Sequence, residues 1–388
     1  MAKSIGRRQV LREGMGFAAG LATLGISGLT IPALAQGEQV VPFSDFPADF
    51  NPSPRPGVRY LDTRTIEGFL TPSDRFFTVQ HYGQPEVDPA TYKLRVTGLV
   101  ERPMELSLAD LKQRPRQELA AGFECSGNNK ARMNGLVGNA RWTGTSLAAL
   151  LRDCRMKSQA REVVFFGADK GSEEVSHGGT TEKVEQRFAR SLAVEDAERP
   201  QVLVAYEMNG APLSLYQGAP VRLIVPGWYG VANIKWLEHI HVQDRRFMGK
   251  FMAREYVTLR GHQVTGETIW NETSVSRMQL KSMVARVTRT GDRYKILGFA
   301  LTDGTPLKAV EVRIDNGSWQ PATIDSSSTP HSWKLFTVIW QSPSSGEHTI
   351  VSRAIDVNGS VQPTDEELGL KKTRWENNGQ VARKVMIS

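Results

Sequence analysis

Cys125 has the surroundings that best suit a metal ligand in this sequence. It lies in the run 122–130 (GFECSGNNK), where small and turn-forming residues follow the cysteine. Such residues let the backbone approach a ligand closely and leave the sulfur accessible, and a thiolate binds soft metal ions. A buried structural cysteine would fit the same run. A disulfide with Cys154, the other cysteine of the chain, is also compatible with the sequence.

Arg222 and Lys235 stand beside apolar runs and predict cations close to a protein core. Arg222 lies early in the run 220–225 (PVRLIV), and Lys235 lies at the start of the apolar segment that follows. A buried arginine needs an anionic partner, although each residue alone fits an ordinary exposed charge equally well. His81 and Asp169 are further polar candidates, and neither is decisive alone. The SxxK, GxSxG, HExxH and GxGxxG patterns are absent from the sequence.

The segment that carries these residues, 76–262, has an α+β pattern. Its short apolar runs predict strands at 92–98, 163–166, 202–206, 221–225 and 234–242. The expected helices, 107–112 and 147–152, begin after Ser107 and after Thr145 or Ser146, which are suitable N-caps. Asn209-Gly210 predicts a hairpin turn. Because strands and helices do not follow a βαβ order, an α+β domain is indicated.

A second pattern begins near residue 278. Strand candidates at 284–287, 294–301, 310–314, 333–340 and 349–355 are separated by turn signals such as Asn316-Gly317. Val310, Val312 and Ile314 alternate with charged residues, as in a half-buried strand. These features predict an all-β, immunoglobulin-like sandwich over residues 278–388. We also expect an extended N-terminal arm over 36–75 and a linker near 262–278.

Composition excludes several functional classes. The 388 residues include 48 Lys and Arg against 41 Asp and Glu, a formal net charge of +7. Since the basic residues form no long run, nucleic-acid binding is not expected. Two cysteines exclude a four-cysteine zinc or iron–sulfur site. No CxxCH motif is present, so no c-type haem is expected in this chain.

Residues 1–35 have the pattern of a twin-arginine export signal. Arg7-Arg8 precedes an uncharged stretch from Gly14 to Ala35, and small residues stand before a cleavage point after Ala35. The glycine-rich stretch favours cleavage over a retained membrane anchor, which would also need about 20 apolar residues. The sequence therefore predicts a periplasmic protein with no stable membrane anchor. Signals of this kind are associated with proteins exported folded, often with a cofactor in place.

Taken together, these motifs resemble the molybdopterin enzymes of the sulfite oxidase family over nearly the whole mature length. The resemblance rests on the runs 124–128 (ECSGN), 203–210 (LVAYEMNG), 218–227 (GAPVRLIVPG) and 235–237 (KWL), with the sandwich behind them. It implies one molybdenum–molybdopterin per chain, with Cys125 as the protein ligand of the metal. It also implies a sulfite oxidase fold for the α+β domain and a homodimer formed through the sandwich.

The resemblance further implies a set of cofactor-contacting positions. These are Phe77, Thr78, Val79, Gln80, His81, Asp169, Gln217, Arg222, Asn233, Ile234 and Lys235. Four positions depart from the family pattern. Val79 and Lys130 stand where the family has arginines, Gln217 replaces a cofactor histidine, and His177 aligns near the active-site tyrosine and is expected to take its place. The cofactor cradle is therefore mostly kept, while the cations that bind sulfite are partly lost.

The expected function is that of an exported molybdenum oxidoreductase. The resemblance implies oxygen-atom transfer to a small sulfur compound, with sulfite as the first candidate. Because no haem is expected in this chain, the electrons would pass to an external acceptor such as a c-type cytochrome. Two alternatives remain open at this point: a reductase of S-oxides or N-oxides on the same cofactor, and a non-catalytic exported binding protein that keeps the fold.

Overall fold

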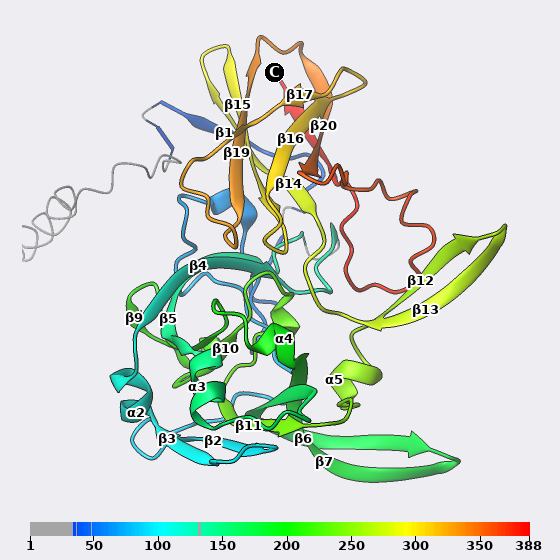
Figure 1. The fold of residues 1–388 in the computed structure, drawn as a ribbon. Coiled ribbons are helices and arrows are strands. Elements are labelled where there is room, and N and C mark those ends of the chain that lie inside the picture. Colours follow the sequence, from blue (N-terminus) through cyan, green and yellow to red (C-terminus); the bar gives the residue numbers. More distant parts are fainter. Residues whose placement is uncertain (1–33, 36, 48, 131–132) are drawn as a thin grey trace, which may run out of the picture.

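Two regions of different architecture make up the computed structural model, which describes residues 34–35, 37–47, 49–130 and 133–388 (Figure 1). The first is the α+β domain, which lies at the bottom of Figure 1. The second is a β-sandwich at the top of the same view. The predicted order of an α+β domain followed by an all-β sandwich is thus confirmed. The predicted twin-arginine motif falls outside the described residues.

Two five-stranded sheets and four short helices form the α+β domain. The first sheet has the order β10-β8-β5-β4, with β9 paired to β8, and the second has the order β3-β2-β11-β6-β7. The strands are β2 Lys93–Gly98, β3 Met104–Ser107, β4 Gln117–Glu124, β5 Val137–Ser146, β6 Glu162–His177, β7 Thr180–Ala193, β8 Leu203–Met208, β9 Ala211–Pro212, β10 Arg222–Ile224 and β11 Leu237–Gln243. The helices are α2 Leu108–Gln113, α3 Leu147–Asp153, α4 Val194–Ala197 and α5 Lys250–Ala253, and three-residue 3-10 turns occur at η2 Thr63–Thr65, η4 Leu215–Gln217 and η5 Gly230–Ala232.

The local signals for helices and turns are confirmed. Ser107 caps α2 in a capping box with Asp110, and the Ser146 hydroxyl caps α3 by accepting a hydrogen bond from the Ala149 N–H. Asn209 and Gly210 have φ values of 53° and 81° and connect β8 to β9. Both residue types adopt the left-handed region readily, which explains why this pair marks the turn.

Strand β11 begins three residues later than expected, at Leu237 rather than at 234. Trp236 has a φ of 50°, and its N–H donates to the Gly218 oxygen. Gly218 has a φ of 93°, and a Cβ there would lie 2.7 Å from the Lys235 Cβ. The segment before β11 therefore leaves the sheet, and close backbone packing at Gly218 holds it in place.

Two hairpins extend further than the sequence indicates, and both project to the right in Figure 1. Strands β6 and β7 pair from their buried ends out to His177 and Thr180. Strands β12 (Val257–Val264) and β13 (Glu267–Ser274) form a second hairpin in the segment expected to be a linker. The outer halves of both hairpins are largely exposed. Since neither face of these outer halves is buried, no apolar alternation marks them in the sequence.

The sandwich has one sheet in the order β1-β14-β15-β19-β18 and a second in the order β17-β16-β20-β21. Its strands are β1 Gln39–Val41, β14 Lys281–Thr290, β15 Arg293–Leu301, β16 Leu307–Ile314, β17 Gln320–Pro321, β18 Thr323–Ile324, β19 Lys334–Gln341, β20 Gly346–Asp356 and β21 Ala382–Ile387. Val287 and Phe336 of the first sheet belong to the same buried core as Val312 and Ile350 of the second. β1 comes from the N-terminal arm, which thus contributes an edge strand to this distant domain.

Between β20 and β21 the chain leaves the sandwich and returns to the α+β domain. We call residues 363–381 the C-terminal strap; part of it is the red coil that reaches the root of β12 in Figure 1. The strap pairs with β12 through two backbone hydrogen bonds, from Gly261 N to Leu370 O at 2.8 Å and from Lys372 N to Leu259 O at 3.0 Å. It also bonds to the segment after Cys125, from Glu376 N to Ser126 O at 2.7 Å. The strap thereby connects the sandwich, the β12–β13 hairpin and the cysteine turn.

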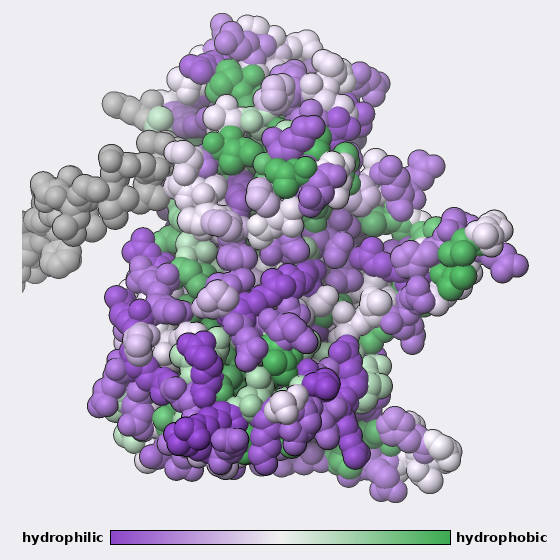
Figure 2. All heavy atoms as spheres, in the orientation of Figure 1, coloured by the Kyte–Doolittle hydropathy of each residue, from purple (hydrophilic) through white to green (hydrophobic). Residues whose placement is uncertain are grey.

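Hydrophilic residues cover most of the face in Figure 2, with apolar groups gathered over the sandwich and at the β12–β13 hairpin. On that hairpin Val264, Ile269 and Trp270 are exposed. Among the residues that the structure describes, no helix has the length and apolar character needed to cross a membrane.

Candidate active site

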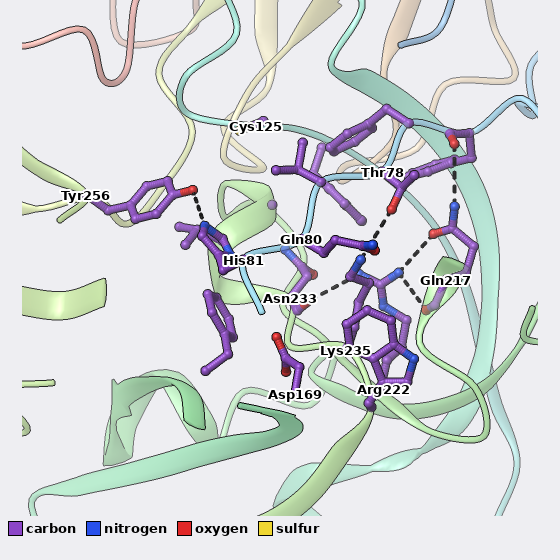
Figure 3. A pocket seen from close by; sticks show the side chains of 18 residues that line it. Thr78, Gln80, His81, Cys125, Asp169, Gln217, Arg222, Asn233, Lys235 and Tyr256 are labelled. Atoms are coloured by element: carbon purple, nitrogen blue, oxygen red, sulfur yellow. Dashed lines mark hydrogen bonds between the residues drawn. The ribbon is translucent and has the colours of Figure 1, made fainter. Parts of the chain in front are cut away.

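A pocket with about 610 Å³ of atom-free space, part of it open to solvent, lies in the α+β domain (Figure 3). Its wall is built from loops and strand ends far apart in the sequence. The lining residues are Phe76, Phe77, Thr78, Val79, Gln80, His81, Phe123, Cys125, Asp169, Phe188, Gln217, Arg222, Gly230, Val231, Asn233, Lys235, Trp236 and Tyr256. In Figure 3 the cations Arg222 and Lys235 lie on one side of the pocket, and Cys125, His81 and Tyr256 lie across from them.

Arg222 is buried, and the side chains and main-chain groups that accept its hydrogen bonds within the described chain are all neutral. Its guanidinium donates to the main-chain and side-chain oxygens of Gln217, at 3.0 and 3.1 Å, and to the main-chain oxygen of Asn233 at 3.0 Å. Its Nε lies buried with no hydrogen-bond partner. Burial lowers the pKa of Arg222 to about 9. A buried guanidinium bonded only to neutral oxygens lacks the anion that its charge requires.

Lys235 is the second cation of this side. Its Nζ donates to the Thr78 hydroxyl at 3.2 Å. Burial, together with the charge of Arg222, lowers the pKa of Lys235 to about 7, against the opposing effect of Asp169. Burial likewise raises the pKa of Asp169 to about 6, although Lys235 opposes it. The pocket therefore holds two cations and one carboxyl group that all lack full solvation, and the cations outnumber the carboxylate.

Cys125 is held at the end of β4 by a tight turn. Its N–H donates to the Leu136 oxygen at 2.9 Å, and its own oxygen accepts from the Asn128 N–H at 2.8 Å. The Asn128 amide donates to Glu124 at 2.9 Å, and Glu124 is paired with Lys281 at 3.0 Å, with both side chains 2% exposed. These bonds fix the backbone around the sulfur without involving it. The expected turn around Cys125 is confirmed, and the sulfur lines the pocket.

Cys154 has a structural environment instead. It is the C-cap of α3, is fully buried and donates its thiol to the Leu151 oxygen at 3.1 Å. Burial raises its pKa to about 11, so the thiol stays protonated at physiological pH. The two cysteines are thiols rather than a disulfide.

Tyr256 and His81 form the remaining polar pair of the pocket. The Tyr256 hydroxyl lies 2.8 Å from His81 Nε2. His81 stacks on Phe188 with ring centroids 4.8 Å apart and contacts Phe251 at 4.6 Å. Burial, with the nearby charges of Lys235 and Lys250, lowers the pKa of His81 to about 4, so the imidazole is neutral at physiological pH. Burial also raises the pKa of Tyr256, and the phenol keeps its proton.

Comparison with known proteins identifies a molybdopterin-binding domain and several similar enzymes. Residues 81–251 match the model for the oxidoreductase molybdopterin binding domain. Human mitochondrial sulfite oxidase is 29% identical over 343 residues, which cover 81% of this chain and 60% of that protein. The sulfite oxidase of Gallus gallus is 29% identical, with coverage of 76% and 69%. Among solved structures, the sulfane dehydrogenase SoxCD from Paracoccus pantotrophus aligns with a TM-score of 0.73 at 25% identity, over 88% of this chain and 90% of that one. The chain contains a molybdopterin-binding oxidoreductase domain and is similar to the sulfite oxidases.

The match does not extend over the full length of every relative. The chain spans about 60% of the length of the mitochondrial sulfite oxidases that it matches. It spans 38% of the NADH nitrate reductase of Ulva prolifera, which is 29% identical. The chain is thus similar to proteins named for different activities.

The pocket of this molybdopterin-binding domain fits a molybdopterin. The cofactor carries a phosphate and a ring with several hydrogen-bonding groups. Arg222 and Lys235 are cations that can pair with an anionic group of the cofactor. The buried oxygen Oε1 of Gln80 has no hydrogen-bond donor within the described protein and can accept one from the cofactor. Within the described chain no cluster of three or more His, Cys, Asp or Glu could hold a metal ion. A metal bound here would therefore combine the Cys125 sulfur with ligands from the cofactor itself.

The pocket brings together most of the residues that the resemblance implies. Residues 77–81, Cys125, Asp169, Gln217, Arg222, Asn233 and Lys235 all line it. Ile234 is buried behind the wall, and its oxygen accepts from the Leu223 N–H at 2.8 Å. Lys130 is exposed and borders a separate polar crevice that also includes Lys281 and Gln380. The structure therefore does not place Lys130 in the wall of this pocket.

The expected placement of His177 is wrong. His177 is exposed at the outer end of β6, where the hairpin turns, and it does not line the pocket. The cause is the length of the β6–β7 hairpin, which carries residues 170–187 away from the buried sheet. The pocket tyrosine is Tyr256, which sequence reasoning missed because it stands alone before β12 with no motif around it. Trp375 of the strap, which stacks on Tyr256, was missed for the same reason.

Proposed function

We propose that the protein is a molybdopterin-dependent oxidoreductase that acts on small sulfur compounds by oxygen-atom transfer. The observation that carries this proposal is one pocket lined by the buried Cys125 thiol and by two cations, Arg222 and Lys235, with Asp169 as the one carboxyl group. When bound, the molybdenum cofactor supplies two-electron redox and oxygen-atom transfer chemistry. Oxidation of a sulfur atom with oxygen from water releases two protons and two electrons, and both must leave the site.

The residues of this chain have separable tasks in that proposal. Cys125 binds the metal, while Arg222 and Lys235 bind the anionic part of the cofactor and gain the partner that their charges need. Tyr256 presents a neutral hydroxyl on the Cys125 side of the pocket, oriented by its hydrogen bond to His81. Phe188 packs against His81 and excludes water from that side.

The substrate side of the pocket favours compounds of low charge. Val79 contributes no charge where the family has an arginine, and His81 is neutral. Lys130 and His177, the two groups expected to add charge, do not line the pocket. We propose a neutral or weakly charged sulfur compound as the better substrate, with sulfite as a poorer one.

Val79→Arg should lower the Michaelis constant for sulfite. Val79 lines the pocket, and a charge-assisted hydrogen bond to an oxyanion contributes roughly 1.5–3 kcal/mol, which corresponds to about 10–100-fold in affinity. Steady-state kinetics of the molybdenum-loaded protein measure this change. Val79→Met, which adds length without charge, is the matched control and should show no gain. A wild-type protein that already saturates at low micromolar sulfite, with no gain from arginine, would contradict this assignment.

Three further features belong to the proposal. We propose export through the twin-arginine signal to the periplasm, a homodimer formed through the sandwich, and electron transfer to an external c-type cytochrome. The composition of the leader and the similarity to the sulfite oxidases support them. A similar protein of known structure, the sulfane dehydrogenase SoxCD, is also named for a sulfur compound.

A substrate panel tests the proposed function. Molybdenum-loaded protein is assayed against reduced sulfur compounds with cytochrome c as the acceptor, and against S-oxides and N-oxides with reduced viologen as the donor. Turnover of a reduced sulfur compound is expected. Turnover of oxides alone would replace the proposal with a reductase. Protein that binds no molybdenum would indicate a binding protein that keeps the fold.

A further inference from the structure

The C-terminal strap forms the support behind the Tyr256 side of the pocket. The Trp375 ring stacks on the Tyr256 ring with centroids 4.3 Å apart and planes 26° apart. Trp375 also covers the cysteine turn, because a Cβ on Gly127 would lie 3.1 Å from its ring. Tyr256 lines the pocket and Trp375 does not, so the indole stands behind the phenol.

Glu376, the next residue of the strap, joins three separate parts of the protein. Its carboxylate accepts a hydrogen bond from the Thr258 hydroxyl at 2.6 Å and one from the Arg260 guanidinium at 3.4 Å, both on β12. Its N–H donates to the Ser126 oxygen beside Cys125 at 2.7 Å. Glu376 is 5% exposed, so these bonds are largely shielded from water.

The Glu376 carboxylate also offsets a buried charge beneath the pocket. Arg190 is 2% exposed, and its guanidinium donates to the main-chain oxygens of Phe251 and Val275. Burial lowers the pKa of Arg190 to about 10, while the negative charge of Glu376 acts in the opposite direction. Phe251 in turn contacts His81.

The backbone of Tyr256 needs such support. Its φ is 57°, in the left-handed region that side chains other than glycine and asparagine rarely adopt. A residue in this region persists only where its surroundings hold it there. The Val275 N–H bonds to the Tyr256 oxygen at 2.8 Å, His81 bonds to its hydroxyl, and Trp375 covers its ring. Of these three supports, only Trp375 comes from the C-terminal region.

We infer that Glu376 is a positioning residue for the pocket. It fixes Trp375 against the ring of Tyr256 and against the Cys125 turn, so that the C-terminal region sets where the Tyr256 hydroxyl lies relative to the Cys125 sulfur. This gives the C-terminal region a part in the reaction besides dimer formation. The inference rests on the proposed function for its kinetic consequence, while its structural consequence stands without it.

Glu376→Ala and Thr258→Val test the inference in the full-length, molybdenum-loaded protein. Glu376→Ala removes the acceptor of the 2.6 Å hydrogen bond, and Thr258→Val removes its donor. Valine keeps the volume of threonine. We expect both variants to lose the near-ultraviolet circular dichroism of the Trp375–Tyr256 stack, defined as the signal that Trp375→Phe changes. We also expect kcat to fall roughly tenfold or more, since small misplacements of reacting groups have effects of that order or larger. Bound molybdenum and pterin should stay at the wild-type level, because Arg222 and Lys235 are untouched.

Glu376→Gln and Glu162→Gln separate positioning from general stability. The glutamine amide oxygen at 376 still accepts from Thr258, so we expect it to restore the dichroism and most of kcat. Glu162 is 4% exposed and accepts from Arg246 and from the Phe247 N–H, away from the pocket, so its variant should keep both signals. Wild-type dichroism and kcat in Thr258→Val would overturn the inference, as would a loss of kcat in Glu162→Gln as large as that in Glu376→Ala. If wild-type protein turns over no sulfur compound, the proposed function fails, and the dichroism and pterin content still decide the role of Glu376.

Discussion

Cys125→Ser should give a folded protein that no longer turns over substrate. The backbone bonds that shape the turn, from Cys125 N to Leu136 O and from Asn128 N to Cys125 O, do not involve the sulfur. The variant should therefore melt close to the wild-type temperature. A hydroxyl is a poor ligand for a soft metal ion. Loss of a hydrogen-bond partner of a metal ligand already costs roughly 10–100-fold in activity, and loss of the ligand itself should cost more.

The matched control is Cys154→Ser. Cys154 caps α3 with its thiol bonded to the Leu151 oxygen, a bond that a serine hydroxyl can also make. Turnover of this variant should match the wild type. Molybdenum content, thermal unfolding and kcat are measured for both variants. Full turnover by Cys125→Ser with molybdenum bound would show that Cys125 is not the metal ligand.

Lys235→Met should stabilise the cofactor-free protein and weaken its hold on the cofactor. The lowered pKa of Lys235, about 7, means that folding disfavours its charged form. This cost is fully present below pH 7 and fades as the pH rises from 7 toward 10.5, the pKa of the unfolded chain. Removing the charge should therefore raise the free energy of unfolding by about 1–2 kcal/mol at pH 7, and the gain should disappear by about pH 10.5. Denaturant unfolding of the cofactor-free protein at several pH values measures it.

Lys235→Met should also weaken the binding of the pterin cofactor. An anion bound next to Lys235 favours the charged form of the lysine. Loss of this charge-assisted hydrogen bond should weaken cofactor binding by about 10–100-fold. Pterin content after dialysis measures this loss. Lys250→Met is the contrasting control. Lys250 pairs with Glu173 at 2.6 Å, and its pKa is raised by that hydrogen bond, so its removal should destabilise the protein at pH 7. A Lys235→Met protein that is no more stable than wild type and retains its pterin would contradict the cradle assignment.

The sequence predicts those parts of the fold in which one residue pattern has one structural solution. Buried strands such as β8 and β10 are short apolar runs, and Ser107 and Ser146 cap helices through their own hydroxyls. The β12–β13 hairpin is different. With both faces exposed for most of its length, it has no core to impose alternation, and its polar composition resembles a linker.

The candidate site divides in the same way. Cys125, Arg222 and Lys235 lie in runs whose composition is unusual in itself, and the pocket contains all three. Tyr256 and Glu376 act through contacts between segments distant in the sequence, and a lone tyrosine or glutamate carries no local signal of such a contact. His177 was misplaced because a polar hairpin of unknown length separates it from the sheet. Side-chain contacts across the two regions are therefore the part that the sequence alone does not reveal.

The return of the strap to the Tyr256 side has a consequence for the order in which the pocket is completed during synthesis. Every residue of the pocket lining has been synthesised once the chain has reached Tyr256. Trp375 and the edge strand β21 follow more than a hundred residues later. At roughly 5–20 residues per second, that interval is on the order of ten seconds. During this interval Trp375 is not yet present behind Tyr256. Strand β1, which is made early, pairs only after β14 has been synthesised. A ligand that enters while the chain is growing meets a wall without its support, which Trp375 supplies only near the end of synthesis.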